Sequence, residues 1–289
     1  MSEKPRGAFP ETAPGQNGAQ KTFRAAKLIE SKFINSAVFC MDFEWTFPPP
    51  RAGQFFMVRP RRTSVFLGRP LSAAAFDAGT LRFLAAVRGR GTEELSAMRP
   101  GEEAELTGPL GNRWADFMPP PGENMRGKNR IALVGGGIGL APLAAFAAEL
   151  PAKRYDFYAG FKTAPDSGEK KALLGAALSG SRNLVIAVEA GGVSERGDAP
   201  KGGGANRQGR ILDFFDPADY RAVFVCGPEP MLKKAAELCR AHAVPCYVSM
   251  ERRMACGVGA CLGCTVTTAN GNRRCCADGP IFNACDVIF

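Results

Sequence analysis

The chain has 289 residues, a formal net charge of +9, ten cysteines and one histidine, His242. This length is enough for two compact domains and a small appendage, and 45% hydrophobic with 22% charged residues is ordinary for a globular protein. A single histidine argues against a Rieske centre, a histidine-based zinc site and a Cys–His or Ser–His catalytic pair. No apolar run is long enough to span a bilayer, no signal pattern opens the chain, and the cysteine usage favours a reducing compartment, so we expect a cytoplasmic protein with no membrane contact.

The positive charge makes nucleic-acid binding a function to consider. The lysines and arginines are scattered, however, and aromatic residues do not interleave with them in one stripe. We therefore expect no nucleic acid, and assign the charge to nucleotide phosphates or to a partner surface.

The N-terminal part reads as a tail followed by a β domain. Residues 1–20 carry one large apolar side chain past Met1, Phe9, and are predicted to be disordered. Residues 21–118 alternate short apolar stretches with turn residues, which predicts an antiparallel β-barrel or sandwich. The expected strands include Ser36–Met41, Gln54–Val58, Ser64–Leu67, Leu81–Val87 and Ala104–Thr107. The proline-rich stretch within residues 119–129 predicts a linker.

Two motifs in the β domain are suited to phosphate. Arg69-Pro70-Leu71-Ser72 offers a guanidinium fork and a hydroxyl. The segment 89–92, which contains Gly91 and Thr92, allows a close backbone approach and a further hydroxyl contact. A solvated turn and a plain hairpin turn are the alternatives for the two motifs.

Residues 130–250 alternate strands with helices, which predicts a doubly wound parallel α/β domain. The expected strands are Ile131–Val134, Tyr155–Phe161, Leu184–Glu189, Ala222–Cys226 and Cys246–Met250, and the expected helices are Leu140–Leu150, Lys170–Leu178 and Pro230–Ala241. Gly191–Gly209 is rich in glycine and charge, so we expect a mobile surface loop.

A glycine-rich turn joins the first of these strands to its helix. Gly135, Gly136, Gly137 and Gly139 fit a pyrophosphate held at a helix N-terminus, although Leu140 breaks the G-x-G-x-x-G pattern. A tight β–α turn is the alternative. Glu189, at the end of the third strand, could bond a ribose hydroxyl and repel a 2′-phosphate, which favours NADH over NADPH. Lys162 and Arg182 could act the other way.

Residues 251–289 form a cysteine-rich module. Cys256, Cys261 and Cys264 have the C-x4-C-x2-C spacing of a plant-type [2Fe–2S] ligand set, and a fourth cysteine follows at 275 or 276. Glycines 257, 259 and 263 remove the Cβ atoms that would keep the backbone from wrapping a cluster. A structural zinc site usually pairs two C-x2–4-C units and only one is present; zinc and unligated buried thiols remain the alternatives. Spacing alone does not choose between Cys275 and Cys276.

The run from Glu251 to Cys264, closed by Cys276-Ala277-Asp278-Gly279-Pro280, resembles the C-terminal signature of the PyrK family. This family comprises the electron-transfer subunits of NAD-dependent class 1B dihydroorotate dehydrogenase, within the ferredoxin–NADP reductase superfamily. The order Arg-Pro-x-Ser, Gly-Thr, Thr107-Gly-Pro-Leu-Gly111 resembles the same family. The resemblance covers residues 22–289.

The resemblance implies three cofactors, FAD, NAD and a [2Fe–2S] cluster, and no catalytic residue in this chain. It selects Cys276 as the fourth ligand, beside Cys256, Cys261 and Cys264. It implies FAD contacts at Arg69, Pro70, Leu71, Ser72, Leu84, Ala85, Ala86, Gly91 and Thr92. It places NAD at Gly135, Gly136, Gly137 and Gly139 and at a second turn, Cys226-Gly227-Pro228. Family members carry bulkier or basic residues where Ala85 and Ala86 stand, so only backbone contacts are expected there.

The resemblance also implies a partner, an FMN-containing catalytic subunit that oxidises dihydroorotate in pyrimidine biosynthesis and docks at the cluster module. We expect a heterotetramer with two copies of each subunit, in which electrons pass from FMN through the cluster and FAD to NAD+. One alternative is the small flavin and [2Fe–2S] subunit of an NADH-dependent ferredoxin:NADP oxidoreductase or of a sulfhydrogenase. The alternative of another class is a non-catalytic binding subunit with a structural zinc.

Overall fold

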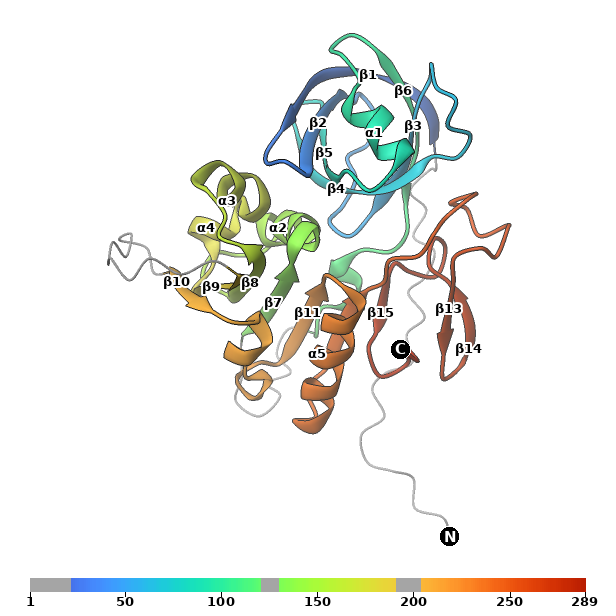
Figure 1. Cartoon of the computed structure of the whole chain (residues 1–289). Coiled ribbons are helices and arrows are strands. Elements are labelled where there is room, and N and C mark those ends of the chain that lie inside the picture. The colour runs from blue at the N-terminus through green and yellow to red at the C-terminus, as the bar shows by residue number, and fades with distance from the viewer. Residues whose placement is uncertain (1–21, 121–129, 191–203) are drawn as a thin grey trace.

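The computed structural model describes residues 22–120, 130–190 and 204–289 (Figure 1). Its N-terminal part is a closed antiparallel barrel with the strand order β1-β2-β5-β4-β3-β6. The barrel strands are β1 (Thr22–Phe33), β2 (Val38–Glu44), β3 (Phe55–Pro60), β4 (Arg69–Asp77), β5 (Thr80–Ala86) and β6 (Glu103–Leu110).

Alternating burial explains why these strands close into a barrel. Along β5, Leu81, Phe83 and Ala85 point into the apolar core, whereas Arg82 and Ala86 face outward. The short helix α1 (Arg90–Ser96) covers one mouth of the barrel and buries Leu95.

One expectation for this part is wrong, and one alternative is excluded. Ser64–Leu67 is no strand, because only Val65 of this segment is buried, and the segment forms the loop between β3 and β4. The Gly89–Thr92 motif begins helix α1 rather than forming a hairpin turn.

The second part is a seven-stranded sheet with the order β10-β9-β8-β7-β11-β12-β15. All neighbours pair in parallel except β12 and β15. Its strands are β7 (Ile131–Gly136), β8 (Tyr155–Thr163), β9 (Leu184–Ala190), β10 (Gly204–Gln208), β11 (Ala222–Cys226), β12 (Cys246–Ser249) and β15 (Ile281–Asn283). The chain reverses its direction of winding between β7 and β11, and the crevice at such a reversal is where doubly wound sheets bind ligands.

Helices cover both faces of this sheet. One face carries α2 (Leu140–Glu149), α3 (Ser167–Leu174) and α4 (Ala177–Gly180), and the other carries α5 (Glu229–Ala241). Four 3-10 turns complete the connections: η1 (Trp114–Phe117), η3 (Gly137–Gly139), η4 (Ile211–Phe214) and η5 (Pro217–Asp219). Helix α2 lies between the sheet and the barrel (Figure 1), where it contacts β4, β7 and β11. Within the described residues, no helix has the length and apolar character that crossing a membrane requires.

The C-terminal module lies beside both parts (Figure 1). It contains the hairpin β13 (Thr265–Thr268) and β14 (Gly271–Arg274), and it ends by adding β15 to the edge of the parallel sheet. The predicted combination of β-barrel, parallel α/β sheet and C-terminal module is confirmed.

Two predicted boundaries in the α/β part are wrong, and some expectations fall on undescribed residues. The expected helix Lys170–Leu178 breaks at Gly175, whose φ of 44° ends α3 before α4 begins. Within the expected loop Gly191–Gly209, residues 204–208 pair with β9 as strand β10. The predicted tail, most of the linker and the rest of that loop lie outside the described residues.

A buried polar network holds the edge of the sheet opposite the nucleotide turns. Asp156 is 1% exposed and accepts hydrogen bonds from Arg130 at 2.5 Å, from the Tyr220 hydroxyl at 2.8 Å and from the Asn183 N–H at 3.2 Å. The Tyr158 hydroxyl lies 2.8 Å from that of Tyr220. A buried carboxylate is tolerated only with such partners.

We therefore expect Asp156→Asn to destabilise the fold by about 2 kcal/mol. The substitution removes the negative charge that pairs with Arg130, and it leaves one of the buried donors around residue 156 without a good hydrogen-bond acceptor. Urea denaturation measures this, with the exposed Asp219→Asn as control. If Asp156→Asn and Asp219→Asn unfold at the same urea concentration, Asp156 does not have the assigned stabilising role.

Candidate functional site

The two barrel motifs for flavin phosphate come together in space. Arg69 opens β4, Gly91 lies in the first turn of α1, and a methyl group at Gly91 would stand 2.1 Å from the Arg69 Nε. The guanidinium therefore lies flat against the start of the helix, where backbone N–H groups lack intrahelical partners. A cation and free N–H groups at one point suit a phosphate.

The Thr92 hydroxyl makes hydrogen bonds within its own loop. It donates to the Gly89 carbonyl at 2.9 Å and accepts from the Arg88 N–H at 2.8 Å. It thus holds the loop that begins α1, so its contribution to a phosphate site would be to position Gly91.

The β5 residues divide between the two faces of the barrel wall. Ala85 is 2% exposed and belongs to the barrel core, so its side chain cannot reach a ligand outside the barrel. Leu84 and Ala86 face outward, on the side of β4. Ser72 and Pro70 are half-buried on the neighbouring strand. Pro70, Ser72, Leu84 and Ala86 therefore share one strip on the outer face of β4 and β5, whereas Leu71 and Ala85 face the barrel core.

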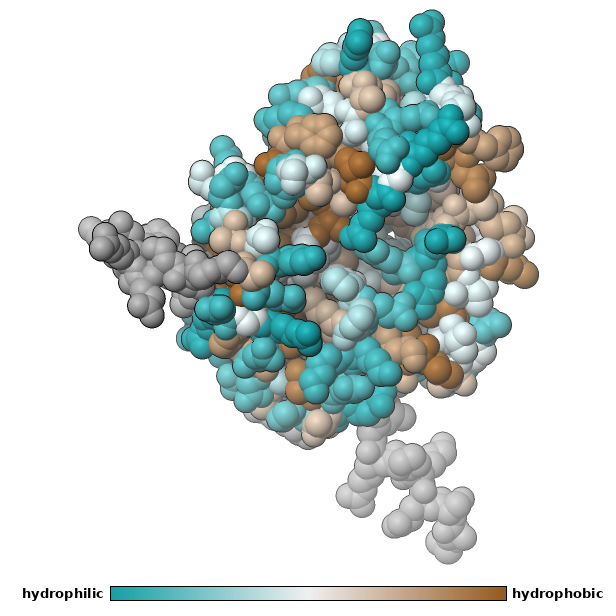
Figure 2. All heavy atoms as spheres, viewed as in Figure 1, coloured by the Kyte–Doolittle hydropathy of each residue, from teal (hydrophilic) through white to brown (hydrophobic). Residues whose placement is uncertain are grey.

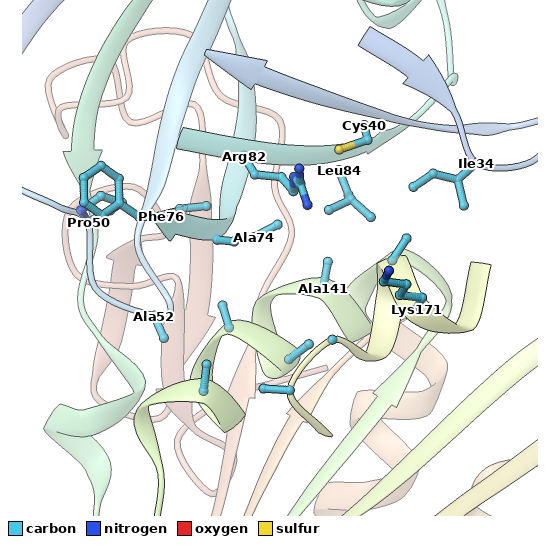
Figure 3. A pocket seen from close by; sticks show the side chains of 18 of the residues that line it. Ile34, Cys40, Pro50, Ala52, Ala74, Phe76, Arg82, Leu84, Ala141 and Lys171 are labelled. Carbon is cyan, nitrogen blue, oxygen red and sulfur yellow. The ribbon is translucent and has the colours of Figure 1, made fainter. Parts of the chain in front are cut away.

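A cavity of about 840 Å³ continues this strip between the barrel and α2 (Figure 3). Ala74, Arg82 and Leu84 line it from the barrel strands, and Ala141 of α2 and Lys171 of α3 line it from the opposite side. Of the predicted cofactor residues only Leu84 lines it. The sequence analysis missed this cavity, because its walls come from segments about 100 residues apart.

The two predicted nucleotide turns meet at the reversal between β7 and β11. Gly135 pairs in register with Cys226, and a methyl group at Gly139 would stand 2.5 Å from the Cys226 carbonyl oxygen. Gly139 is therefore required for the close approach of the turns. Gly137 has a φ of 56° and open space beside it. The glycine turn thus leaves room at the start of α2, where a pyrophosphate would bind.

Two further groups stand at the same end of the sheet. Burial and the charge of Glu251 raise the pKa of the Cys226 thiol to about 12, so this thiol is neutral at physiological pH. Glu189 is exposed near the end of β9, where its carboxylate is free to meet a ribose.

The four predicted cluster ligands lie as two pairs. The Cys261 N–H donates to the Cys256 sulfur at 3.4 Å, and the Cys276 N–H donates to the Cys264 sulfur at 3.4 Å. Cys256 is half-buried and Cys261 exposed, whereas Cys264 and Cys276 are buried. Two pairs of thiols suit a group with two metal atoms, one pair for each.

Backbone donors make the Cys256 thiol acidic. Burial raises the pKa of the Cys256 thiol, but N–H groups of Cys261 and Val258 and the Cys261 thiol outweigh it and lower the pKa to about 6. A thiolate is the form that binds metal. In the deeper pair, burial and the neighbouring Cys264 thiol raise the pKa of Cys276 to about 12.

Cys275 points away from these thiols. Its own thiol is fully buried and donates to the Met250 carbonyl at 3.1 Å. Burial first, and the neighbouring cysteines second, raise its pKa to about 12. This geometry favours Cys276 as the fourth ligand, in line with the sequence-based prediction.

Asp278 joins the closure of the module to its ligand loop. Arg274 donates two side-chain hydrogen bonds to Asp278, both at 3.0 Å, and a third to the Gly259 carbonyl at 3.4 Å. Burial raises the pKa of Asp278, but the bonds from Arg274 outweigh it and lower the pKa. The positive φ angles of Gly257 and Gly259 let the loop turn under this link.

Asn112 is a residue that the sequence analysis missed. Its side chain donates to the carbonyls of Asp278 and Ile281 at 3.3 and 2.8 Å and accepts from the Ile281 N–H at 3.0 Å. Its own N–H donates to the Gly279 carbonyl at 2.8 Å. Asn112 therefore fastens the end of the barrel to the cluster module. No local signal reveals contacts across about 170 residues.

We expect Asn112→Ala to loosen this attachment by about 2 kcal/mol, because three backbone groups lose their partner. After reconstitution with iron and sulfide, the module should lose iron faster on mild heating. Asn272→Ala on the exposed strand β14 is the matched control. Identical rates of iron loss would show that Asn112 does not hold the module.

The donor set itself suits iron and sulfide better than zinc. One zinc ion needs four ligands around a single point. Within the described residues, no three or more His, Cys, Asp or Glu side chains gather closely enough to hold one metal ion. Two cysteine pairs with backbone donors to sulfur match a binuclear cluster.

Comparisons with known proteins agree with this geometry. Residues 251–288 match the family model described as the iron-sulfur cluster binding domain of dihydroorotate dehydrogenase B. The electron transfer subunit of dihydroorotate dehydrogenase B (NAD(+)) from Clostridium acetobutylicum is 35% identical over 93% of this chain and 99% of its own length. The subunit of the same name from Clostridium perfringens is 37% identical over 82% of this chain and 87% of its own length.

Solved structures show the same fold. The structure of an NADH-dependent reduced ferredoxin-NADP oxidoreductase aligns with a TM-score of 0.69 and 24% identity, covering 91% of this chain and 89% of that one. A ferredoxin reductase of carbazole 1,9a-dioxygenase aligns with a TM-score of 0.57 and 20% identity, over 78% and 67% of the two chains. The family predicted from the motifs is confirmed by the curated relatives: this chain belongs to the electron transfer subunits of dihydroorotate dehydrogenase B (NAD(+)).

Proposed function

We propose that this chain is the electron-transfer subunit of an NAD-dependent dihydroorotate dehydrogenase, an oxidoreductase of pyrimidine biosynthesis. The observation that carries the proposal is the pair-wise arrangement of Cys256 with Cys261 and of Cys264 with Cys276, inside a module that matches the iron–sulfur domain of that enzyme. The near full-length relatives bear the same name.

The residues proposed for each cofactor follow from the geometry above. Arg69, Ser72 and the start of α1 at Gly91 would hold FAD, with Pro70, Leu71, Leu84, Thr92 and the backbone of Ala85 and Ala86 beside it. The turns Gly135–Gly139 and Cys226–Pro228 would hold NAD. When bound, the flavin converts between the electron pairs of nicotinamide and the single electrons of a [2Fe–2S] cluster.

The protein's own part is placement and exclusion of water. Gly139 lets the two nucleotide turns approach closely, and Gly257 lets the ligand loop pack on the Met57 side chain. Asn112 fixes the module against the barrel through the carbonyls of Asp278 and Ile281. The buried, neutral Cys226 adds no charge beside the nucleotide turn.

The partner proposed is an FMN-containing catalytic subunit, in a cytoplasmic complex with two copies of each chain. The relatives' names give an electron transfer subunit and hence a catalytic one. FMN in that subunit, the stoichiometry and the compartment are our proposal.

Purified protein tests this function. We expect bound FAD together with a cluster whose iron and acid-labile sulfide are equal in amount to each other, and NAD+ reduction with dihydroorotate once the organism's catalytic subunit is added. Zinc in place of iron, with no flavin, would refute the proposal.

A second candidate is the small subunit of an NADH-dependent reduced ferredoxin:NADP oxidoreductase, because that structure aligns over 91% of this chain. Reduced ferredoxin as electron donor separates the two candidates. We expect the holoprotein to accept electrons through the dihydroorotate-oxidising subunit, and not to couple ferredoxin to NADP.

A further inference from the structure

Two loops expose large apolar side chains beside the cluster ligands. In the β3–β4 loop, residues 61–68, Phe66 is 87% and Leu67 40% exposed; in the ligand loop, residues 256–264, Val258 is 43% and Leu262 63% exposed. We call these four side chains the apolar edge. They are four of the nine strongly exposed large apolar side chains among the described residues, and single scattered ones would need no explanation.

The two loops are neighbours, because both touch the same residue of β3. A methyl group at Gly68 would stand 3.2 Å from the Met57 Cβ, and one at Gly257 would stand 2.6 Å from the Met57 Cγ. Figure 2 shows brown and tan side chains along the rim of the molecule where the barrel meets the C-terminal module. The apolar edge is therefore one surface built from segments about 190 residues apart.

The β3–β4 loop is held in place rather than loose. Val65 is buried, the Val65 N–H donates to the Thr63 hydroxyl at 2.8 Å, and the Ser64 hydroxyl donates to Glu94 of α1 at 3.2 Å. Thr63 also bonds Glu94. With its neighbours fixed, Phe66 is presented to solvent in a set position, so its burial by a partner would cost little ordering entropy.

The ligand loop presents its apolar residues in the same way. Leu262 has a φ of 58°, a conformation that side chains rarely adopt, and its carbonyl accepts from the Thr265 hydroxyl at 2.7 Å. Val258 and Leu262 flank Cys261, the most accessible of the four predicted ligands. Such a strained, exposed leucine is kept where the surrounding structure or a function requires it.

We propose that the apolar edge, with Phe66 as its anchor, is the surface on which the catalytic subunit of the dehydrogenase docks. This inference rests on the proposed function: electrons must cross between the two proteins close to Cys256 and Cys261, so the partner must cover the ligand loop. It adds the β3–β4 loop of the barrel as the second half of the contact. An exposed aromatic side chain on a fixed loop is the typical anchor of an interface.

The charged residues around the apolar edge indicate which side chains the surface of the partner carries. Arg62 on the β3–β4 loop and Arg253 before the ligand loop are exposed. The partner surface is therefore an apolar hollow for Phe66 and Leu262 with acidic side chains at its rim. Raised salt should slow association more than it speeds dissociation.

The test is the affinity of the holoprotein for the catalytic subunit from the same organism, measured by calorimetry. Phe66→Ala is expected to weaken binding at least tenfold, which is about 1.4 kcal/mol, and Leu262→Ala should weaken it as well. Phe33→Ala is the matched control, because Phe33 is 55% exposed and lines the cavity between barrel and α2 instead. Flavin and iron contents, and NADH-dependent reduction of a small artificial acceptor, should stay unchanged in Phe66→Ala.

The outcomes separate this inference from the function it rests on. Wild-type protein that does not bind the catalytic subunit overturns both. Wild-type binding with equal affinity for Phe66→Ala overturns the docking surface alone. A wild-type homodimer that Phe66→Ala dissociates, with catalytic-subunit binding intact, assigns the edge to a second copy of this chain and also overturns the proposal.

Discussion

Replacing Cys276 with serine is expected to lower the iron retained per chain by about tenfold or more. Even residues that only support a metal ligand cost 10–100-fold in affinity when they are changed, and Cys276 is assigned as a ligand itself. The backbone N–H of residue 276, which donates to the Cys264 sulfur, is kept in the serine variant, so the experiment reports on the Cys276 thiol alone. Iron and sulfide analysis after anaerobic purification measures the effect.

Cys275→Ser is the matched control for that experiment. The serine hydroxyl can keep the hydrogen bond to the Met250 carbonyl, which the Cys275 thiol now makes at 3.1 Å. We therefore expect a normal iron content and at most a small loss of stability. Iron loss in Cys275→Ser but not in Cys276→Ser would reverse the ligand assignment.

Replacing Arg69 with alanine is expected to weaken FAD binding by about 100-fold. A charge-assisted bond contributes about 1.5–3 kcal/mol, and the guanidinium of Arg69 lies directly over Gly91 at the start of α1. Apoprotein titrated with FAD and followed by flavin fluorescence gives the dissociation constant.

Arg99→Ala provides the comparison for Arg69, since it removes an equal charge just beyond the other end of α1. If both variants bind FAD with the same affinity as the wild type, Arg69 has no phosphate role. If both lose affinity equally, the effect is that of net charge and not of position.

The patterns that a single segment carries could be predicted from the sequence. The strand Ala222–Cys226 was predicted with the bounds that the structure gives, because its five apolar residues are followed by Gly227 and Pro228 and include two valines and a phenylalanine, which favour a strand. The spacing of Cys256, Cys261 and Cys264 likewise depends on local geometry alone. Helix α1 was missed, because Gly89 and Gly91 resemble a turn and only tertiary contacts decide that Leu95 is buried under the barrel mouth.

What depends on distant contacts could not be predicted. Asn112 has no partner within its own segment, and its role exists only when Asp278 and Ile281 arrive from the C-terminal module. Ser64–Leu67 shows the opposite error: its apolar residues look like a strand, but Phe66 and Leu67 face solvent on a loop. Nothing in the part of the chain that the structure describes covers Phe66 and Leu67, and this exposure is the reason for proposing that a partner binds there.

The most direct test is paramagnetic resonance of the anaerobic, reduced holoprotein. The account predicts a [2Fe–2S] signal after reduction with NADH, from protein that also contains FAD, because Cys256, Cys261, Cys264 and Cys276 would hold the cluster near the flavin strip. A sample that carries zinc on these thiols and shows no such signal, even after reduction with dithionite, would contradict it.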